Sequence, residues 1–218
     1  MAESTSLPIP RTTSPLYGAQ AGELAGQLAT LSTEELAKIL RVNHRIAATN
    51  RLRYSRFHDN AERALPALAA YTGIVFKRIA PADFTAGDFE YAQAHLNITS
   101  FLYGLLRPLD TIRTYRLEGD AVLPGDGILV NLASSEMKRL FDWKRICREV
   151  RVVTPEFRIR EDDRLKTVVV YTKMCRGEMT RHILKNRIGD PQQLKAFEWE
   201  GFRLNPTLSK ADDWVFTM

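Results

Sequence analysis

The sequence predicts a single compact α/β domain in which a mixed sheet is surrounded by helices. Helical and strand-like patterns alternate along the whole chain, which is typical of this class. Two segments that flank residues 161–163 show the period-two alternation of an antiparallel hairpin, so part of the sheet is expected to be antiparallel. A length of 218 residues with 44% apolar content is sufficient for one core over residues 1–218.

The N-terminal quarter is predicted to be helical after an irregular start. Residues 1–18 contain three prolines and no apolar period, so we expect an irregular lead-in. A helical pattern begins at Gly22. Ser32 and Glu35 then have the spacing of a capping box, and a second helical run continues to about Phe57.

The next stretch predicts a strand, a helix and a further strand. YTGIVFKRI at 71–79 favours a short buried strand, and Thr85 with Asp88 is expected to cap a helix that ends near Leu96. The apolar residues 99–110 are predicted to cross the core as one strand that ends in a turn.

The second half of the chain is predicted to supply most of the sheet. Its expected elements are a buried parallel-type strand at 127–133, a helix to about Arg148, a hairpin of 151–160 with 164–172, a helix at 175–188, and strands at 197–204 and 213–217.

Composition narrows the class of protein. The 31 Lys and Arg against 26 Asp and Glu leave a formal charge of +5, which permits a polyanionic partner. Two cysteines cannot form a disulfide framework, and the four histidines have no ligand spacing, so we expect no metal and no cofactor. No apolar run or leader pattern indicates a membrane, and we expect a cytoplasmic protein.

The stretch 41–58 is the first candidate site. It holds five arginines and no acidic residue, spread over two predicted helices and the short connection between them. Such a pair can present backbone amides and basic side chains to phosphate, although the glycines usual in a DNA-binding helical hairpin are missing. The alternative is a solvated basic helix face. The candidate residues are Arg41, Asn43, His44, Arg45, Arg53 and Arg56.

A second candidate combines both signs of charge near a turn. Its residues are Arg107, Asp110, Tyr115, Arg116 and Glu118. They indicate either a site or an ion-pair network; the structural alternative is that Arg107 and Asp110 hold a proline turn.

Polar side chains also follow the predicted strand at 127–133. Asn131 and Ser134 lie where α/β sheets place ligands, at the carboxyl end of a strand. Ser134 could equally be a helix N-cap, and no nucleophile elbow surrounds it.

The last candidate is an anion site at the start of the predicted helix 175–188. Charge and helix dipole would both favour an anion there. Cys175 lies among these basic groups and could be reactive, or it could be a buried small hydrophobe. The candidate residues are Lys173, Arg176, Gly177, Arg181 and Arg187.

Several long motifs resemble the YaaA family of peroxide-stress proteins. They are DFEYAQAHLNITSFLYGLLRPLDTIRTYRLEG, ILVNLASSEM, KMCRGEMTRHILKNRI and FEWEGFRL, in that order, and the similarity runs from about Ser14 to the C-terminus. The resemblance implies a cytoplasmic bacterial protein with a compact mixed α/β "cantaloupe" fold, a basic cleft and a helix-hairpin-helix at about 33–57. It also implies peroxide tolerance, limitation of free iron, and DNA binding linked to repair, without an established catalytic activity.

The chain differs from that family pattern in two places. Relatives begin with an apolar strand carrying a Ser-Pro-Ala-Lys-like motif, and we expect a downstream start or a trimmed sequence here. Relatives also carry an aromatic-rich helical segment before the ILVNLAS strand, whereas PGDG at 124–127 runs straight into it. The chain is thus either a degraded copy or a divergent variant with a smaller fold.

The leading functional hypothesis is a protein that binds duplex or branched DNA through backbone phosphates, without reading bases. Arg45, Arg53 and Arg56 would form one wall of the cleft, and Lys173, Arg176 and Arg181 the other. The alternative is an enzyme acting on DNA or nucleotides through the polar groups at 107–118, 131–134 and 173. Direct iron sequestration is a third hypothesis, which the scattered histidines disfavour.

Overall fold

The computed structural model describes residues 1–59, 64–115, 128–132, 142–162 and 164–218. The chain divides into two compact units, and each is described by itself. Unit 1 comprises Met1–Thr72 and Phe84–Val122, and unit 2 comprises Gly73–Asp83 and Leu123–Met218. Helices and strands occur in both units, so the mixed α/β class is confirmed.

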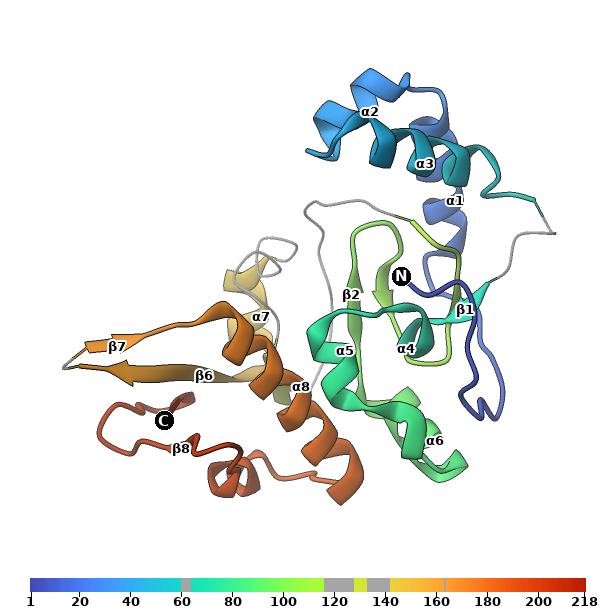
Figure 1. Cartoon of the computed structure of the whole chain (residues 1–218). Coiled ribbons are helices and arrows are strands. Elements are labelled where there is room, and N and C mark those ends of the chain that lie inside the picture. Colours follow the sequence, from blue (N-terminus) through green and yellow to red (C-terminus); the bar gives the residue numbers. More distant parts are fainter. Residues whose placement is uncertain (60–63, 116–127, 133–141, 163) are drawn as a thin grey trace. The chain divides into compact units, whose positions relative to one another are not determined.

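Three helices form the first part of unit 1 (Figure 1). They are α1 (Gly18–Ala29), α2 (Thr33–Ile39) and α3 (His44–Ser55), and α3 packs against both of the others. The capping box predicted at α2 is present, with Ser32 accepting from the Glu35 amide and Glu35 accepting from the Ser32 amide. The irregular lead-in is also confirmed, because no helix begins before Gly18.

The rest of unit 1 is built from short elements. They are β1 (Leu65–Pro66), α4 (Ala67–Ala70), α6 (Ala86–His95), β2 (Ile98–Ser100), β3 (Gly104–Leu106) and β4 (Thr111–Ile112). The predicted Thr85–Asp88 cap of α6 is confirmed. The prediction of one strand over 99–110 is wrong: β2 and β3 form an antiparallel hairpin, and Gly104, with φ +69°, supplies the backbone conformation at its turn.

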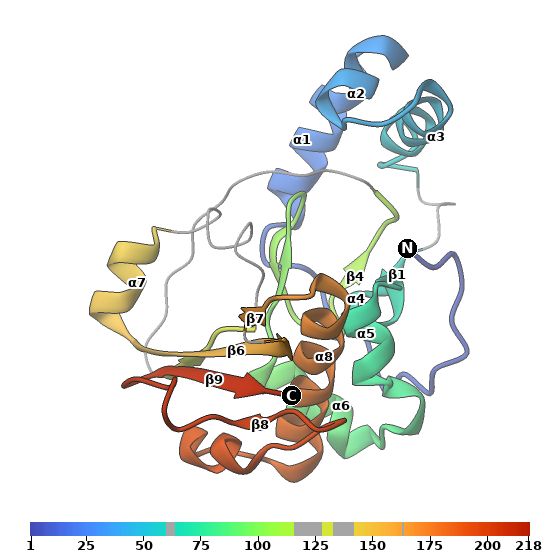
Figure 2. The ribbon, with the colours of Figure 1, turned by 60° about the vertical axis from the view of Figure 1, so that its left-hand side comes forward.

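Unit 2 is a sheet with α8 packed against its long strand β6 (Figures 1 and 2). The strand order is β5-β6-β9-β8, and β7 pairs with the far end of β6. β5 and β9 run parallel to β6, whereas β7 is antiparallel to it. The elements are α5 (Ile74–Ile79), a 3₁₀ turn (Pro81–Asp83), β5 (Ile128–Val130), α7 (Trp143–Glu149), β6 (Arg151–Glu161), β7 (Arg164–Lys166), α8 (Val169–Asn186), a 3₁₀ helix (Pro191–Ala196), β8 (Arg203–Leu204) and β9 (Asp213–Thr217).

Two predicted strands of unit 2 are helices. Residues 74–79 form α5, in which Val75 and Ile79 are one helical turn apart and α5 packs along α8. The hairpin is confirmed only near its turn, because β7 ends at Lys166 and the β-branched run that follows opens α8. In α5, packing along α8 outweighs the strand preference of valine and isoleucine.

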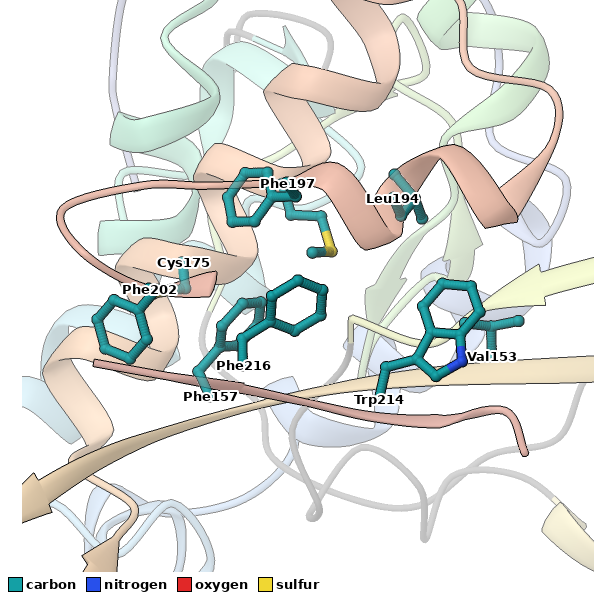
Figure 3. Packing of buried hydrophobic residues seen from close by; sticks show 9 residues of the cluster. Val153, Phe157, Cys175, Leu194, Phe197, Phe202, Trp214 and Phe216 are labelled. Atoms are coloured by element: carbon teal, nitrogen blue, oxygen red, sulfur yellow. The ribbon is translucent and has the colours of Figure 1, made fainter. Parts of the chain in front are cut away.

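The core of unit 2 is mainly aromatic (Figure 3). Trp214 and Val153 lie at one end of this cluster and Phe202 and Cys175 at the other. Phe157 of β6 stacks on Phe216 of β9, with ring centroids 5.4 Å apart. These contacts hold α8 and the sheet together and fix which residues of α8 remain exposed.

Candidate nucleic-acid interface

A hollow on the surface of unit 1 lies along the N-terminal part of α3. Asn43 is the N-cap of α3, and its side-chain oxygen accepts from the Ile46 amide at 3.0 Å. The hollow has a volume of about 390 Å³. It is lined by Asn43, Arg45, Ile46, Thr49, Asn50 and Arg53. Arg45 and Arg53 are about two turns apart on α3, so helical periodicity places both on the face that lines the hollow.

The arginines near the hollow differ in their hydrogen-bond and ion-pair partners. Arg41 and Arg45 are exposed, and neither side chain has a hydrogen-bond or ion-pair partner among the described residues. Arg53 lies 3.6 Å from a carboxylate oxygen of Glu3, which is 83% exposed, so that pair is weak. At least two unneutralised guanidinium groups therefore remain near the start of α3.

The other two candidates in this stretch have partners nearby. His44 Nε2 lies 3.1 Å from Glu34 Oε1. Arg56 is the C-cap residue of α3, and its carbonyl oxygen accepts from the Arg113 guanidinium. These two positions lie outside the lining of the hollow.

Asn50 is a residue of this site that the sequence reasoning missed. It lies in the middle of α3 and is only 2% exposed. Its side-chain oxygen has no hydrogen-bond partner among the described residues. The sequence alone does not mark this position, because burial of an amide depends on what packs against its helix.

The predicted start of the helix at 175 is wrong, and the anion site predicted there therefore has no helix N-terminus. α8 begins at Val169, so Lys173 and Arg176 lie inside the helix, where backbone amides are already bonded within it. Lys173 is exposed and has no partner among the described residues. Arg176 is half-buried, and burial lowers its pKa, opposed by the nearby charge of Glu156.

The remaining candidates on α8 have roles in the fold. A Cβ on Gly177 would lie 2.5 Å from the Val75 carbonyl oxygen, so this glycine lets α5 approach α8. Arg181 donates to both carboxylate oxygens of Asp83 and to the carbonyl oxygen of Ile79. Arg187 ends α8 in the left-handed conformation, with φ +52°.

The charged turn at 107–110 agrees with its structural alternative. Asp110 is 1% exposed and accepts from the backbone amide and the guanidinium of Arg107, at 2.8 and 3.0 Å. Asp110 Oδ1 also accepts a hydrogen bond from the Thr13 hydroxyl at 2.6 Å. Asp110 therefore connects the N-terminal lead-in, through Thr13, to the turn at 107–110.

Tyr115 belongs to a buried hydroxyl network of unit 1. Its hydroxyl lies 2.7 Å from Ser100 Oγ and 2.9 Å from the Tyr71 hydroxyl. Burial is the main cause that raises the pKa of Tyr115, and it raises that of Tyr71 as well. Neither phenol is positioned as an exposed acid or base.

Asn131 follows β5 in unit 2, is 5% exposed, and its backbone amide donates to the Val153 carbonyl at 2.8 Å. The predicted residues Arg116, Glu118 and Ser134 lie outside the described residues.

The described part of the chain lacks two further features, a metal-binding cluster and a membrane-spanning helix. No three His, Cys, Asp or Glu side chains in it gather closely enough to share a metal ion. None of its helices is both long and apolar enough to cross a membrane. Cys175 is fully buried, and burial raises the pKa of its thiol to about 12, which agrees with a packing role.

Comparison with known proteins gives consistent matches. A family model described as peroxide stress protein YaaA matches residues 1–127 and 120–208. The chain is 53% identical over 241 residues to a UPF0246 protein of Bacteroides thetaiotaomicron, covering 99% of this chain and 94% of that protein. A UPF0246 protein of Teredinibacter turnerae is 32% identical over 228 residues, covering 90% of this chain and 87% of that protein.

These alignments also locate a difference in length. The alignment with the Bacteroides thetaiotaomicron protein runs over 241 positions, more than the 218 residues of this chain, so that relative contains residues with no counterpart here. The two ranges of this chain that match the family model, 1–127 and 120–208, overlap at 120–127, next to the place where the sequence indicated a missing internal segment.

Proposed function

Because the chain belongs to the peroxide stress protein YaaA family, we propose that it acts in the peroxide response by binding the phosphate backbone of DNA through α3. The observation that carries this proposal is the hollow lined by Arg45 and Arg53, next to the N-terminal turn of a 12-residue helix. Guanidinium groups bind phosphate oxygens in a fork geometry, and the helix N-terminus also favours negative charge.

The distribution of charge supports α3 as the binding surface. From His44 to Ser55, α3 carries three arginines and no acidic residue. On α8, by contrast, Arg181 is bonded to Asp83, so its charge is largely neutralised in the fold. The contact would be electrostatic and independent of base sequence, and bound protein would shield cytoplasmic DNA or assist its repair while iron-derived oxidants are present.

The alternative of an enzyme on DNA receives less support. Among the groups that it would use, Arg107, Asp110 and Tyr115 are each engaged in a contact that holds unit 1 together. We therefore retain DNA binding as the proposal.

The test compares two double variants with the same loss of charge. Arg45→Ala with Arg53→Ala should weaken binding to every duplex sequence by about tenfold or more, and should reduce the slope of log affinity against log salt by about 1.8. Fluorescence anisotropy of a labelled duplex at several salt concentrations measures both quantities.

The control is Arg160→Ala with Arg164→Ala, on the β6–β7 hairpin. Both side chains are exposed and have no partner among the described residues. This variant should bind almost like wild type. Equal losses in the two variants would mean that net charge, rather than α3, determines the affinity.

A further inference from the structure

The connection between α2 and α3 has the length of the turn in a helix-turn-helix pair. Residues 40–43 join the two helices, and Arg41 among them takes the left-handed conformation, with φ +50°. Helix α3 packs against α1 as well as α2, and Figures 1 and 2 show the three helices together. In DNA-binding proteins that contain such a pair, the second helix lies in the major groove. The side of α3 that α1 and α2 leave exposed therefore corresponds to a recognition surface.

This exposed side of α3 has an uncharged centre. The residues that α3 buries are Ala47, Asn50 and Tyr54. Helical periodicity places Ala48, Thr49 and Leu52 on the opposite side, and all three are exposed. The exposed fraction of Leu52 is 51%. We call these three residues the outer face of α3.

The outer face offers methyl groups and no free hydrogen-bond donor. Ala48 and Leu52 have no polar side-chain atom, and the Thr49 hydroxyl donates to the Arg45 carbonyl oxygen at 3.1 Å. Contacts made by the outer face are therefore apolar. A single exposed leucine is common on protein surfaces, but this one lies in a helix that carries three arginines and no acidic residue.

A partner of this surface must combine phosphate groups with an apolar group between them. Arg45 precedes the outer face along α3 and Arg53 follows it. The major groove of B-DNA is wide enough for an α-helix, and the C5 methyl group of thymine is exposed in it. The minor groove is too narrow for a helix and does not present this methyl group. Charge and apolar character together therefore favour the major groove of duplex DNA.

We propose that α3 enters the major groove of duplex DNA, with Arg45 and Arg53 on the phosphates and the outer face against the C5 methyl groups of thymine. This inference rests on the proposed function and makes its ligand more specific. Phosphate contacts are the same for every base sequence. The methyl contacts add a preference for duplexes that carry thymine at the centre of the bound site.

The first experiment compares two ligands on the wild-type protein. Both are the same hairpin duplex of A·T pairs closed by G·C pairs, and in one of them uracil replaces every thymine. This replacement removes only the C5 methyl groups, and the charge and the hydrogen-bonding edges stay the same. The thymine duplex should bind at least about fourfold more tightly, which is the factor for burying one methyl group. Equal affinities in fluorescence anisotropy would overturn the inference.

The second experiment removes the apolar side chain and keeps the charge of α3. Leu52→Ser should lower the affinity for the thymine duplex to about that for the uracil duplex, and should leave the affinity for the uracil duplex almost unchanged. The control is Val169→Ser in α8, because Val169 is 62% exposed. This control should keep the preference for thymine. A preference that persists in Leu52→Ser, or that disappears equally in Val169→Ser, would contradict the role of Leu52.

The outcomes separate this inference from the proposed function. If wild-type protein binds neither duplex, both proposals fail. If it binds both equally and loses both on Arg45→Ala with Arg53→Ala, only the methyl contact fails. Sedimentation velocity tests the other possible occupant of the outer face, a second copy of the chain. A wild-type dimer that becomes a monomer on Leu52→Ser would assign Leu52 to an interface between copies and overturn the inference.

Discussion

A Cβ atom at position 177 would lie 2.5 Å from the carbonyl oxygen of Val75, on the facing helix α5. It would also lie 2.5 Å from Cβ of Arg78. Backbone atoms of α5 cannot move aside in the way that the end of a flexible side chain can. The short distance between α5 and α8 therefore requires that residue 177 has no side chain.

We expect Gly177→Ala to lower the free energy of unfolding by about 1–3 kcal/mol, because α8 must move away from α5. Urea denaturation measures this change. The control is Gly26→Ala in α1, where an added Cβ meets no atom within 4 Å. That variant should gain up to about 1 kcal/mol from helix propensity. The same sign of change in both variants would contradict the packing argument.

The pair between Asp83 and Arg181 should make unit 2 sensitive to acid. Hydrogen bonds from Arg181 are the main cause that lowers the pKa of Asp83 below its ordinary value of 3.8. A carboxyl group whose pKa is lower in the folded state than in the unfolded state stabilises the fold at pH values above its ordinary pKa. This stabilisation is lost as the pH falls through the pKa of the folded state. Acid should therefore weaken the pair only below about pH 3.8.

Asp83→Asn should thus reduce the free energy of unfolding at pH 6 by about 0.5 kcal/mol, a small effect because the carboxylate is more than half exposed. The difference from wild type should shrink towards pH 3, as measured by urea denaturation at both values. Glu198→Gln is the control, since Glu198 is exposed and has no partner among the described residues. A difference that grows in acid would refute the assigned role.

The two cysteines should differ in reactivity. Cys147 on α7 is exposed, whereas Cys175 is buried and burial raises the pKa of its thiol to about 12. Because the thiolate is the reactive form, iodoacetamide at pH 8 should modify Cys147 alone in the folded protein and both residues in urea. Peptide mass spectrometry measures each site. Native Cys147→Ser should then remain unmodified, and rapid labelling of native Cys175 would contradict its burial.

Local signals in the sequence predicted several elements correctly. The capping pairs Ser32–Glu35 and Thr85–Asp88 are determined by residues three apart, so no tertiary information is needed. The shared face of Arg45 and Arg53 likewise follows from helical periodicity.

Elements that depend on distant partners were not predictable in the same way. Val168–Tyr171 and Ile74–Ile79 have strand preference, yet the second of these packs as a helix on α8 about one hundred residues later. The helix predicted to begin at 175 begins at Val169 instead, so the anion site predicted at 175 has no helix N-terminus. The hollow at Asn50 was missed because burial of an amide cannot be read from one helix alone.

The assignment of Gly73–Asp83 to unit 2 has a consequence for how the chain folds. This segment precedes the later part of unit 1 in the sequence, so neither unit is one continuous stretch. During synthesis α5 is made long before α8. The hydrogen bond from Arg181 to the Ile79 carbonyl oxygen joins residues that are 102 positions apart in the sequence. Until α8 is made, Ile79 lacks its partner helix, and pairing over such a separation is slow. We expect a cut anywhere between residues 83 and 169 to leave neither fragment with a complete unit 2.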